Sequence, residues 1–308
     1  MQIWEESVEA IRRDTIAGAA ELAERAVGVI HQWLDQQRSM PLTHWKQDLF
    51  DLGCALVAAQ PSMAPLFNLV NEVFLAIETT PTLDEARQQV RRTAQTFMYE
   101  LKGSQARLVE AALPLFSAEC RVLTFSYSST VLEMLRAVRA LGIAVTVYCT
   151  EGRPLLEGRR LAQQLAAAGM EVRFGIDAAV SIFARQASLA LVGADSLTHV
   201  GVVNKLGTTA LARAAADAGI PCFVIGSRHK CFPAAAPLPE FHPQRPSEEV
   251  WPDPPAGIKV WNTYFECTPL AFFSGIILET GRLAPEVLVQ TLSAMPVASM
   301  WRTQRLDR

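Results

Sequence analysis

The spacing of apolar residues divides the chain into two regions with different periods. In the first hundred or so residues, apolar side chains recur every three or four positions, as in "SVEAIRRDTIAGAAELAERAVGVIHQWLDQQ" (7–37) and "ARQQVRRTAQTFMYELKG" (86–103). This spacing is typical of amphipathic helices, and prolines at 41, 61, 65 and 81 mark the breaks. We therefore predict a helical N-terminal domain over residues 1–115.

After Cys120 the pattern changes to short apolar runs that alternate with helical stretches. Runs that are apolar on both faces are typical of parallel strands covered by helices. Three of the helical stretches end in a glycine, the usual left-handed stop. The sequence thus predicts an α/β fold, with a Rossmann-like, doubly wound parallel sheet over 116–308. Its five strands are expected at 121–127, 144–150, 171–177, 189–195 and 221–227, and the glycines are Gly142, Gly169 and Gly219.

The last third of the chain contains two further features. Residues 230–257 carry eight prolines and are read as a long irregular loop, which would form part of a subunit contact or a cover over the site. The stretch "IKVWNTYFECTPLAFFSGIILETG" (258–281) predicts another strand and a helix opened by Thr268-Pro269.

Composition narrows the class of protein. With 308 residues, 50% hydrophobic and 19% charged, the chain can bury a sizeable core. The formal net charge of −3 gives no field that would draw the protein to nucleic acid or to a membrane, so a small ligand held by local cations is favoured. Charges interrupt the N-terminus, and no run of about 20 apolar residues occurs, which predicts a cytoplasmic protein.

Standard cofactor and metal signatures are missing from the sequence. The six cysteines are scattered without a C-x-x-C pair, so reduced and mostly buried thiols are expected, and no metal site. Neither G-x-G-x-x-G nor G-x-x-x-x-G-K-[ST] occurs, which argues against dinucleotide and P-loop chemistry, and no cofactor is expected.

Candidate site residues follow the predicted strands, because ligands bind at the carboxyl ends of such sheets. The hydroxyls of Ser126, Ser128 and Ser129 either cap a helix or contact the ligand, and these roles are compatible. Asp195 follows a strand and is assigned to a pocket or, alternatively, to capping. Asn204 and Lys205 are expected to open a helix and to capture phosphate.

For the other polar residues at the strand ends we predict roles that are mostly structural. Arg153 either contacts phosphate or pairs with Glu151 or Glu157. Asp177 is read as a helix N-cap rather than an acid or base, and Lys230 as part of a solvated face. His229 and Cys231 flank that lysine, but two potential ligands do not make a metal site.

Four stretches, in order, resemble a known family. "LTFSYSSTVLEML", "TEGRPLLEGRRLAQQLAAAGMEVRFGIDAAV", "VGADSLTHVGVVNKLGTTALA" and "VWNTYFECTP" are similar to the α, β and δ regulatory subunits of translation initiation factor 2B. The same family includes aldose–ketose isomerases that act on methylthioribose 1-phosphate and ribose 1,5-bisphosphate. "DTIAGAAELA" (14–23) resembles the family's phosphate loop, which makes Gly18 a candidate ligand contact.

The resemblance implies a sugar-phosphate or nucleoside monophosphate pocket between the two domains, in a homodimer or larger oligomer. It also implies a catalytic pair in the isomerases, a cysteine and the aspartate of GAD, which here is Asp195. The cysteine position is Ser126, whose hydroxyl needs an adjacent base to replace a thiol. Ala17 stands where the isomerases tend to carry arginine, and the loop 193–205 is about one residue shorter.

These departures leave two functions open. The first is a protein that binds a phosphorylated sugar or nucleotide without isomerase chemistry, and the substitution of the cysteine favours it. The second is an aldose–ketose isomerase in which Asp195 moves the proton, and Ser126 or a substrate phosphate replaces the thiol.

Overall fold

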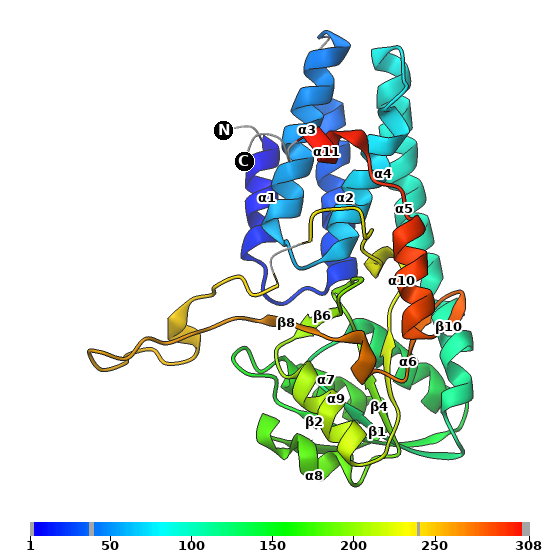
Figure 1. The fold of residues 1–308 in the computed structure, drawn as a ribbon, viewed down its shortest axis with the longest axis vertical. Coiled ribbons are helices and arrows are strands. Elements are labelled where there is room, and N and C mark those ends of the chain that lie inside the picture. Colours follow the sequence, from blue (N-terminus) through cyan, green and yellow to red (C-terminus); the bar gives the residue numbers. More distant parts are fainter. Residues whose placement is uncertain (1–2, 37–39, 239–240, 304–308) are drawn as a thin grey trace.

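The computed structural model describes residues 3–36, 40–238 and 241–303, and it has a helical region standing on an α/β region (Figure 1). The prediction of an α/β fold with a helical N-terminal part and a mostly parallel sheet is confirmed. The helical region consists of α1 (Ile3–Arg13), α2 (Ala19–Gln36), α3 (Leu42–Ala59), α4 (Ala64–Ile77) and α5 (Leu83–Ala112).

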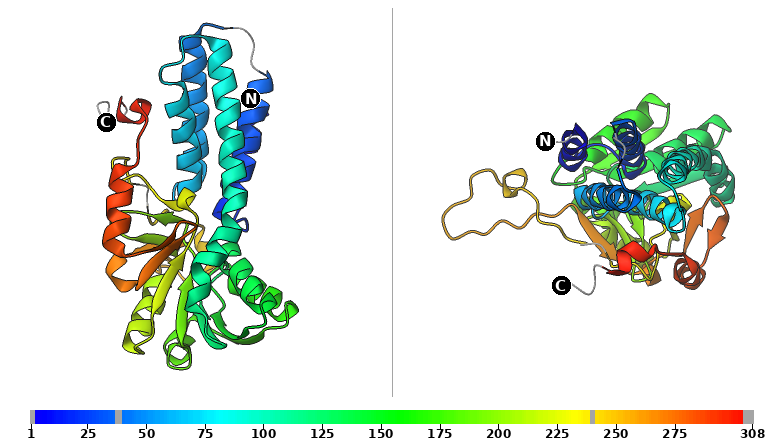
Figure 2. Two further views of the ribbon diagram at one scale, coloured as in Figure 1. Left: turned by 90° about the vertical axis from the view of Figure 1, so that its right-hand side faces the viewer. Right: turned by 90° about the horizontal axis from the view of Figure 1, so that it is seen from above.

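Helix α5 joins the two regions. Its 30 residues begin at the N-cap Thr82, whose hydroxyl accepts a hydrogen bond from the Glu85 amide at 3.3 Å, and acidic residues fill the first turn. The helix packs on α2 and α4 at one end and on α6 (Ser129–Ala140) and the edge of the sheet further along, so it runs beside both regions (Figure 2). The domain boundary at 115/116, between the end of α5 and the first strand, stays a prediction.

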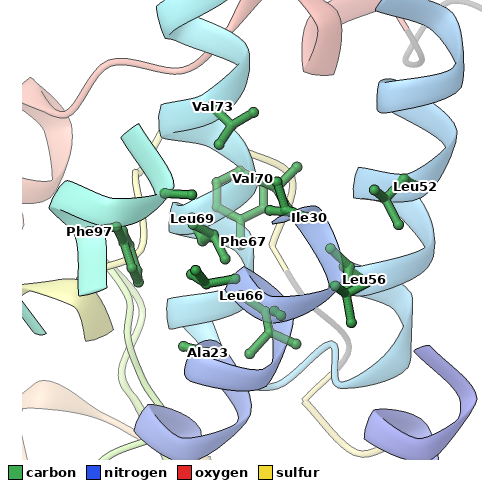
Figure 3. Packing of buried hydrophobic residues seen from close by; sticks show 14 of the residues in the cluster. Ala23, Ile30, Leu52, Leu56, Leu66, Phe67, Leu69, Val70, Val73 and Phe97 are labelled. Carbon is green, nitrogen blue, oxygen red and sulfur yellow. The ribbon is translucent and has the colours of Figure 1, made fainter. Parts of the chain in front are cut away.

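Large apolar side chains fill the space between the helices of the first region (Figure 3). The ring centroids of Trp33 and Trp45 lie 5.2 Å apart. The C-terminal helix α11 (Ser299–Thr303) returns to this core, where the Trp301 ring stacks on Phe67 with centroids 5.1 Å apart. The beginning and the end of the described chain therefore share one hydrophobic core.

A seven-stranded sheet forms the centre of the α/β region, in the order β10-β9-β7-β4-β1-β2-β3. All neighbours are parallel except the edge strand β10. The five predicted strands are confirmed, and the helices α6, α7 and α9 are each followed by the predicted glycine at positive φ. The strands are β1 (Glu119–Thr124), β2 (Ala144–Thr150), β3 (Glu171–Gly175), β4 (Leu189–Val192), β7 (Cys222–Ile225), β9 (Gly275–Leu278) and β10 (Gly281–Leu283).

The remaining helices cover or flank this sheet. They are α7 (Glu157–Ala167), α8 (Val180–Ala184), α9 (Thr208–Asp217) and α10 (Pro285–Ala294). Short 3-10 turns occur at Leu113–Leu115, Asp177–Ala179, Arg228–Lys230, Ser247–Glu249 and Leu270–Phe272.

Two expectations about local structure are wrong. Residues 204 and 205 do not open a helix, because they end β6 (Val202–Lys205), which pairs antiparallel with β5 (Ser196–Leu197) and β8 (Phe265–Thr268) in a small second sheet. The segment after Pro269 is a single 3-10 turn followed by β9, since the buried run at 275–278 completes the large sheet beside β7.

The proline-rich segment leaves the body of the protein as a long arm, visible at the side of the molecule (Figures 1 and 2). Residues 239 and 240 of this segment lie outside the described residues. Trp251, Ile258 and Trp261 are exposed in this part of the chain. None of the described helices is long and apolar enough to cross a membrane.

Candidate functional site

A pocket lies where the helical region meets the carboxyl ends of the strands. Seven of the eight predicted site residues line it: Gly18, Ser126, Ser128, Ser129, Asp195, Asn204 and Lys205. They come from the loop between α1 and α2, from the β1–α6 loop, from the residues after β4 and from β6. The pocket thus lies at the edge of the sheet where the topology predicts a ligand site.

Two helices begin at the pocket wall. The first turns of α2 and α6 both line the pocket, and in the described part of the chain the amides of Ala19 and Ser129 have no hydrogen-bond acceptor. Ser128 caps α6 by accepting from the Val131 amide at 3.3 Å. A Cβ on Gly193 would lie 2.4 Å from the Ser128 oxygen, so only glycine fits there. Helix N-termini with open amides are suited to an anionic group.

The loop before α2 is held by one carboxylate. Asp14 Oδ1 accepts from the amides of Ile16 and Ala17, both at 2.7 Å, and Oδ2 accepts from Arg25 at 2.6 Å. The described part of this periodic stretch, residues 7–36, thus falls in two helices, α1 and α2, with a turn between them. The turn brings Gly18 to the pocket, where a Cβ added to this glycine would lie 3.8 Å from the Ser129 hydroxyl oxygen.

Ser126 occupies a strained position. Its φ of 59° lies in the left-handed region, and its buried hydroxyl forms no hydrogen bond with any described residue. The described residues that line the pocket include no histidine and no cysteine. The wall does contain the Asp195 carboxyl, but no base among the described residues forms a hydrogen bond with the Ser126 hydroxyl.

Backbone hydrogen bonds hold Asp195 in place, while its carboxylate forms no hydrogen bond with a described residue. Its amide donates to Val203 at 2.8 Å, and its carbonyl accepts from Ala64 at the start of α4 at 3.1 Å. Burial raises the pKa of the carboxyl to about 6, while Lys230 and Lys205 counteract part of this rise. A carboxyl that titrates near neutral pH is suited to proton transfer.

On the pocket wall formed by β6, α9 and β8, the polar groups that were expected to bind phosphate have partners within the protein. Lys205 forms an ion pair with Glu157 at 2.7 Å, and Asn204 donates to the Thr208 hydroxyl at 3.0 Å. Glu266 accepts from the Gly207 amide at 2.7 Å, from the Thr209 amide at 2.9 Å and from the Thr209 hydroxyl at 2.8 Å. Glu266 therefore already satisfies the donors at the start of α9, and the expected phosphate capture by Asn204 and Lys205 stays a prediction.

Three readings of polar residues need correction. Arg153 does not line the pocket, and its guanidinium donates to the Val250 carbonyl at 3.2 Å rather than pairing with a glutamate. Asp177 is not a helix N-cap, because it accepts from the amides of Gly152 and Arg153 at 2.9 and 2.8 Å. Lys230 is not solvated: only 7% of it is exposed, and it lines the pocket.

Sequence reasoning also missed Arg245 and Tyr264, which complete the pocket wall. The Arg245 guanidinium lies 4.8 Å from the Tyr264 ring centroid, and the Lys205 ammonium lies 5.1 Å from it. Nothing local in the proline-rich segment marks Arg245, whereas the place of Lys230 just after a predicted strand was a usable signal. Histidine, cysteine, aspartate and glutamate side chains of the described residues form no cluster that could hold a metal ion. All six cysteines are free, and four of them are buried.

Comparisons with known proteins agree with this architecture. A protein of Pyrococcus furiosus named translation initiation factor eIF-2B subunit 2-like is 30% identical over 90% of this chain and 95% of its own. Ribose 1,5-bisphosphate isomerase of Archaeoglobus fulgidus is 29% identical over 92% of this chain and 90% of its own. The crystal structure of the Pyrococcus horikoshii OT3 translation initiation factor eIF-2B superposes with a TM-score of 0.82 at 27% identity, covering 94% of this chain and 100% of that one. The profile of the Initiation factor 2 subunit family matches residues 15–285, and the chain belongs to this family.

Proposed function

We propose that this protein binds a phosphorylated sugar or nucleotide in the pocket and does not perform thiol-dependent isomerisation. The observation that carries the proposal is the pair of open helix starts, α2 and α6, that face the same pocket. Each offers backbone N–H groups and the positive end of a helix dipole to a phosphate. Gly18, Ser128 and Ser129 border this phosphate subsite, and Asn204 and Lys205 form the opposite wall.

The absence of a thiol supports the second half of the proposal. Ser126 stands at the family's cysteine position, and its hydroxyl has no base in contact among the described residues. A serine hydroxyl needs an adjacent base to take over the proton transfer of a thiol, so this position favours binding without thiol chemistry. A homodimer or larger oligomer stays a prediction, which the exposed apolar side chains of the arm support.

The experiment has a binding arm and a turnover arm. Native mass spectrometry with ribose 5-phosphate, ribose 1,5-bisphosphate and adenosine monophosphate should show a one-to-one complex with at least one of them. The same preparation should show no conversion of ribose 1,5-bisphosphate or methylthioribose 1-phosphate to the ketose. Absence of every complex would overturn the binding proposal.

One observation favours isomerase activity as a second candidate function. Asp195 lies in the pocket with its pKa raised to about 6 by burial, which is the state expected of a general base or acid. Several relatives are sugar-phosphate isomerases by name, for ribose 1,5-bisphosphate or for methylthioribose 1-phosphate. Turnover by the wild type that is abolished in Asp195→Asn would establish this candidate in place of the first.

A further inference from the structure

His229 is a buried histidine between the two regions of the molecule. It belongs to the 3-10 turn Arg228–Lys230 that follows β7, and only 2% of it is exposed. Its ring lies edge-on to Phe97 of α5, with the ring centroids 4.5 Å apart. Asn68 of α4 donates from its amide nitrogen to the carbonyl of His229 at 2.7 Å. The residue therefore joins α4 and α5 to the turn beside the large sheet.

Neither ring nitrogen of His229 has a hydrogen-bond partner in the described part of the chain. Nε2 lies 3.9 Å from the Glu100 carboxylate, beyond hydrogen-bond reach, and that carboxylate already pairs with Arg228. A neutral imidazole carries one N–H, whereas an imidazolium carries two donors and a charge. Because burying a charge without an acceptor is costly, these surroundings suit the neutral ring.

Charged and titratable groups surround this turn on the elements that pack against it. They are Glu72 on α4, Glu100 on α5, Glu279 after β9, and Arg228, Lys230 and Cys231 in or next to the turn. Burial raises the pKa of the Glu72 carboxyl, which favours its neutral form. Glu279 accepts from the Arg228 amide at 2.8 Å, and Glu100 pairs with the Arg228 guanidinium. The carboxylates near the ring are thus already engaged or favoured in the neutral form.

The direction of the pH dependence follows from this environment. Burial, and to a lesser extent the Arg228 charge, lower the pKa of the His229 imidazole from 6.5 to about 4. Between these two values the unfolded chain binds a proton at this residue and the folded chain does not. The contribution of His229 to stability is therefore complete above pH 6.5 and is lost as the pH falls to 4.

We propose that His229 is an acid-sensitive contact between the helical region and the α/β region. The neutral ring holds α5 on the turn after β7. Protonation places a second positive charge beside Arg228 and opens this contact. Because Lys230 follows His229 and lines the pocket, the opening also loosens the pocket wall, whatever the pocket binds.

Urea unfolding at pH 7 and pH 5 measures the effect on stability in the wild type, His229→Leu and His44→Leu. The folding equilibrium constant of the wild type should fall roughly twentyfold more than that of His229→Leu between these pH values, because only the wild-type ring takes up a proton on unfolding. His44→Leu replaces an exposed histidine of α3 and should follow the wild type. Circular dichroism verifies that each variant is folded at both pH values.

Hydrogen exchange shows where the molecule opens. From pH 7 to pH 5, after correction for intrinsic exchange rates, amide protection in the wild type should fall in α5 around Phe97 and in the turn Arg228–Lys230. Helix α7, which packs on β2 and β3, should keep its protection and serves as the internal reference. In His229→Leu the protection of α5 should be the same at both pH values.

Three results would overturn the inference. A difference between the wild type and His229→Leu that does not depend on pH would mean that His229 acts by packing alone. A wild type that gains stability on acidification relative to this variant would mean that Glu100 pairs with the imidazolium. Equal loss of protection in α5 and α7 would mean that the whole molecule opens rather than this contact.

A measurement on the wild type keeps the inference testable if His229→Leu does not fold. The ring protons of His229 can be followed by NMR as the pH is lowered, with His229→Gln used to assign the signal. A titration midpoint below about 5 supports an acid-sensitive contact, and a higher midpoint overturns it.

Discussion

Two sides of the pocket differ in how completely their polar groups are paired. On the β6, α9 and β8 side, Lys205, Asn204 and the start of α9 all have partners within the protein. On the other side, the starts of α2 and α6, Asp195 and Lys230 keep donors and an acceptor open. The difference shows that a polar sequence motif does not by itself mark a binding surface. Its donors and acceptors are available to a ligand only if no residue elsewhere in the chain already forms hydrogen bonds or ion pairs with them.

Removal of the carboxylate that saturates one side should have the largest effect on stability. Glu266→Ala deletes a group that accepts three hydrogen bonds at the start of α9, and we expect a loss of about 3 kcal/mol in the free energy of unfolding. Urea denaturation would measure it. Ligand affinity should be unchanged, and a stability within about 0.5 kcal/mol of the wild type would contradict the comparison.

On the side of the pocket with unpaired groups, Asp195 should make the free energy of unfolding depend on pH. The folded pKa of Asp195, about 6, lies above the ordinary pKa of 3.8 for this carboxyl, so its contribution to stability is present below pH 4 and is lost as the pH rises through 6. Relative to Asp195→Asn, which does not titrate there, the wild type should lose about 2 to 3 kcal/mol between pH 4 and pH 7. Urea unfolding at several pH values would show this, whereas a difference independent of pH would contradict it.

The smallest expected effect on stability comes from removing one of two hydroxyl N-caps, Ser128 of α6 or Thr82 of α5. Ser128→Ala and Thr82→Ala should each cost about 1 kcal/mol, because each removes a side-chain acceptor at a helix start. Only Ser128 lines the pocket, so only Ser128→Ala should also weaken phosphate binding, measured by calorimetry. Equal affinities in the two variants would place the phosphate away from α6.

Local patterns predicted most of the large sheet and its helices. Apolar runs and terminal glycines located β1, β2, β3, β4 and β7, and the strand ends located four residues of the pocket, Ser126, Ser128, Ser129 and Asp195. These features depend on neighbours in the sequence, such as a glycine that adopts a positive φ two residues after a helix. They are therefore visible without the fold.

Pairings over long sequence distances could not be predicted. Lys205 meets Glu157 from 48 positions away, and Asn68 meets the carbonyl of His229 from 161 positions away. The first pairing neutralises Lys205, which the motif had suggested was available to a phosphate. The second fixes the backbone on either side of Lys230, a lysine that we had expected to be exposed to solvent. Which cation remains available is thus a property of the tertiary structure.

The return of α11 to the helical core has a consequence for the order of synthesis. Trp301 packs on Phe50, Phe67 and Phe74, so these three rings of the helical region obtain this partner only after the α/β region has been translated. The first five helices leave the ribosome with this part of their surface uncovered. During that interval the nascent chain exposes an aromatic face to chaperones and to other nascent chains, and completion of the C-terminal segment closes it.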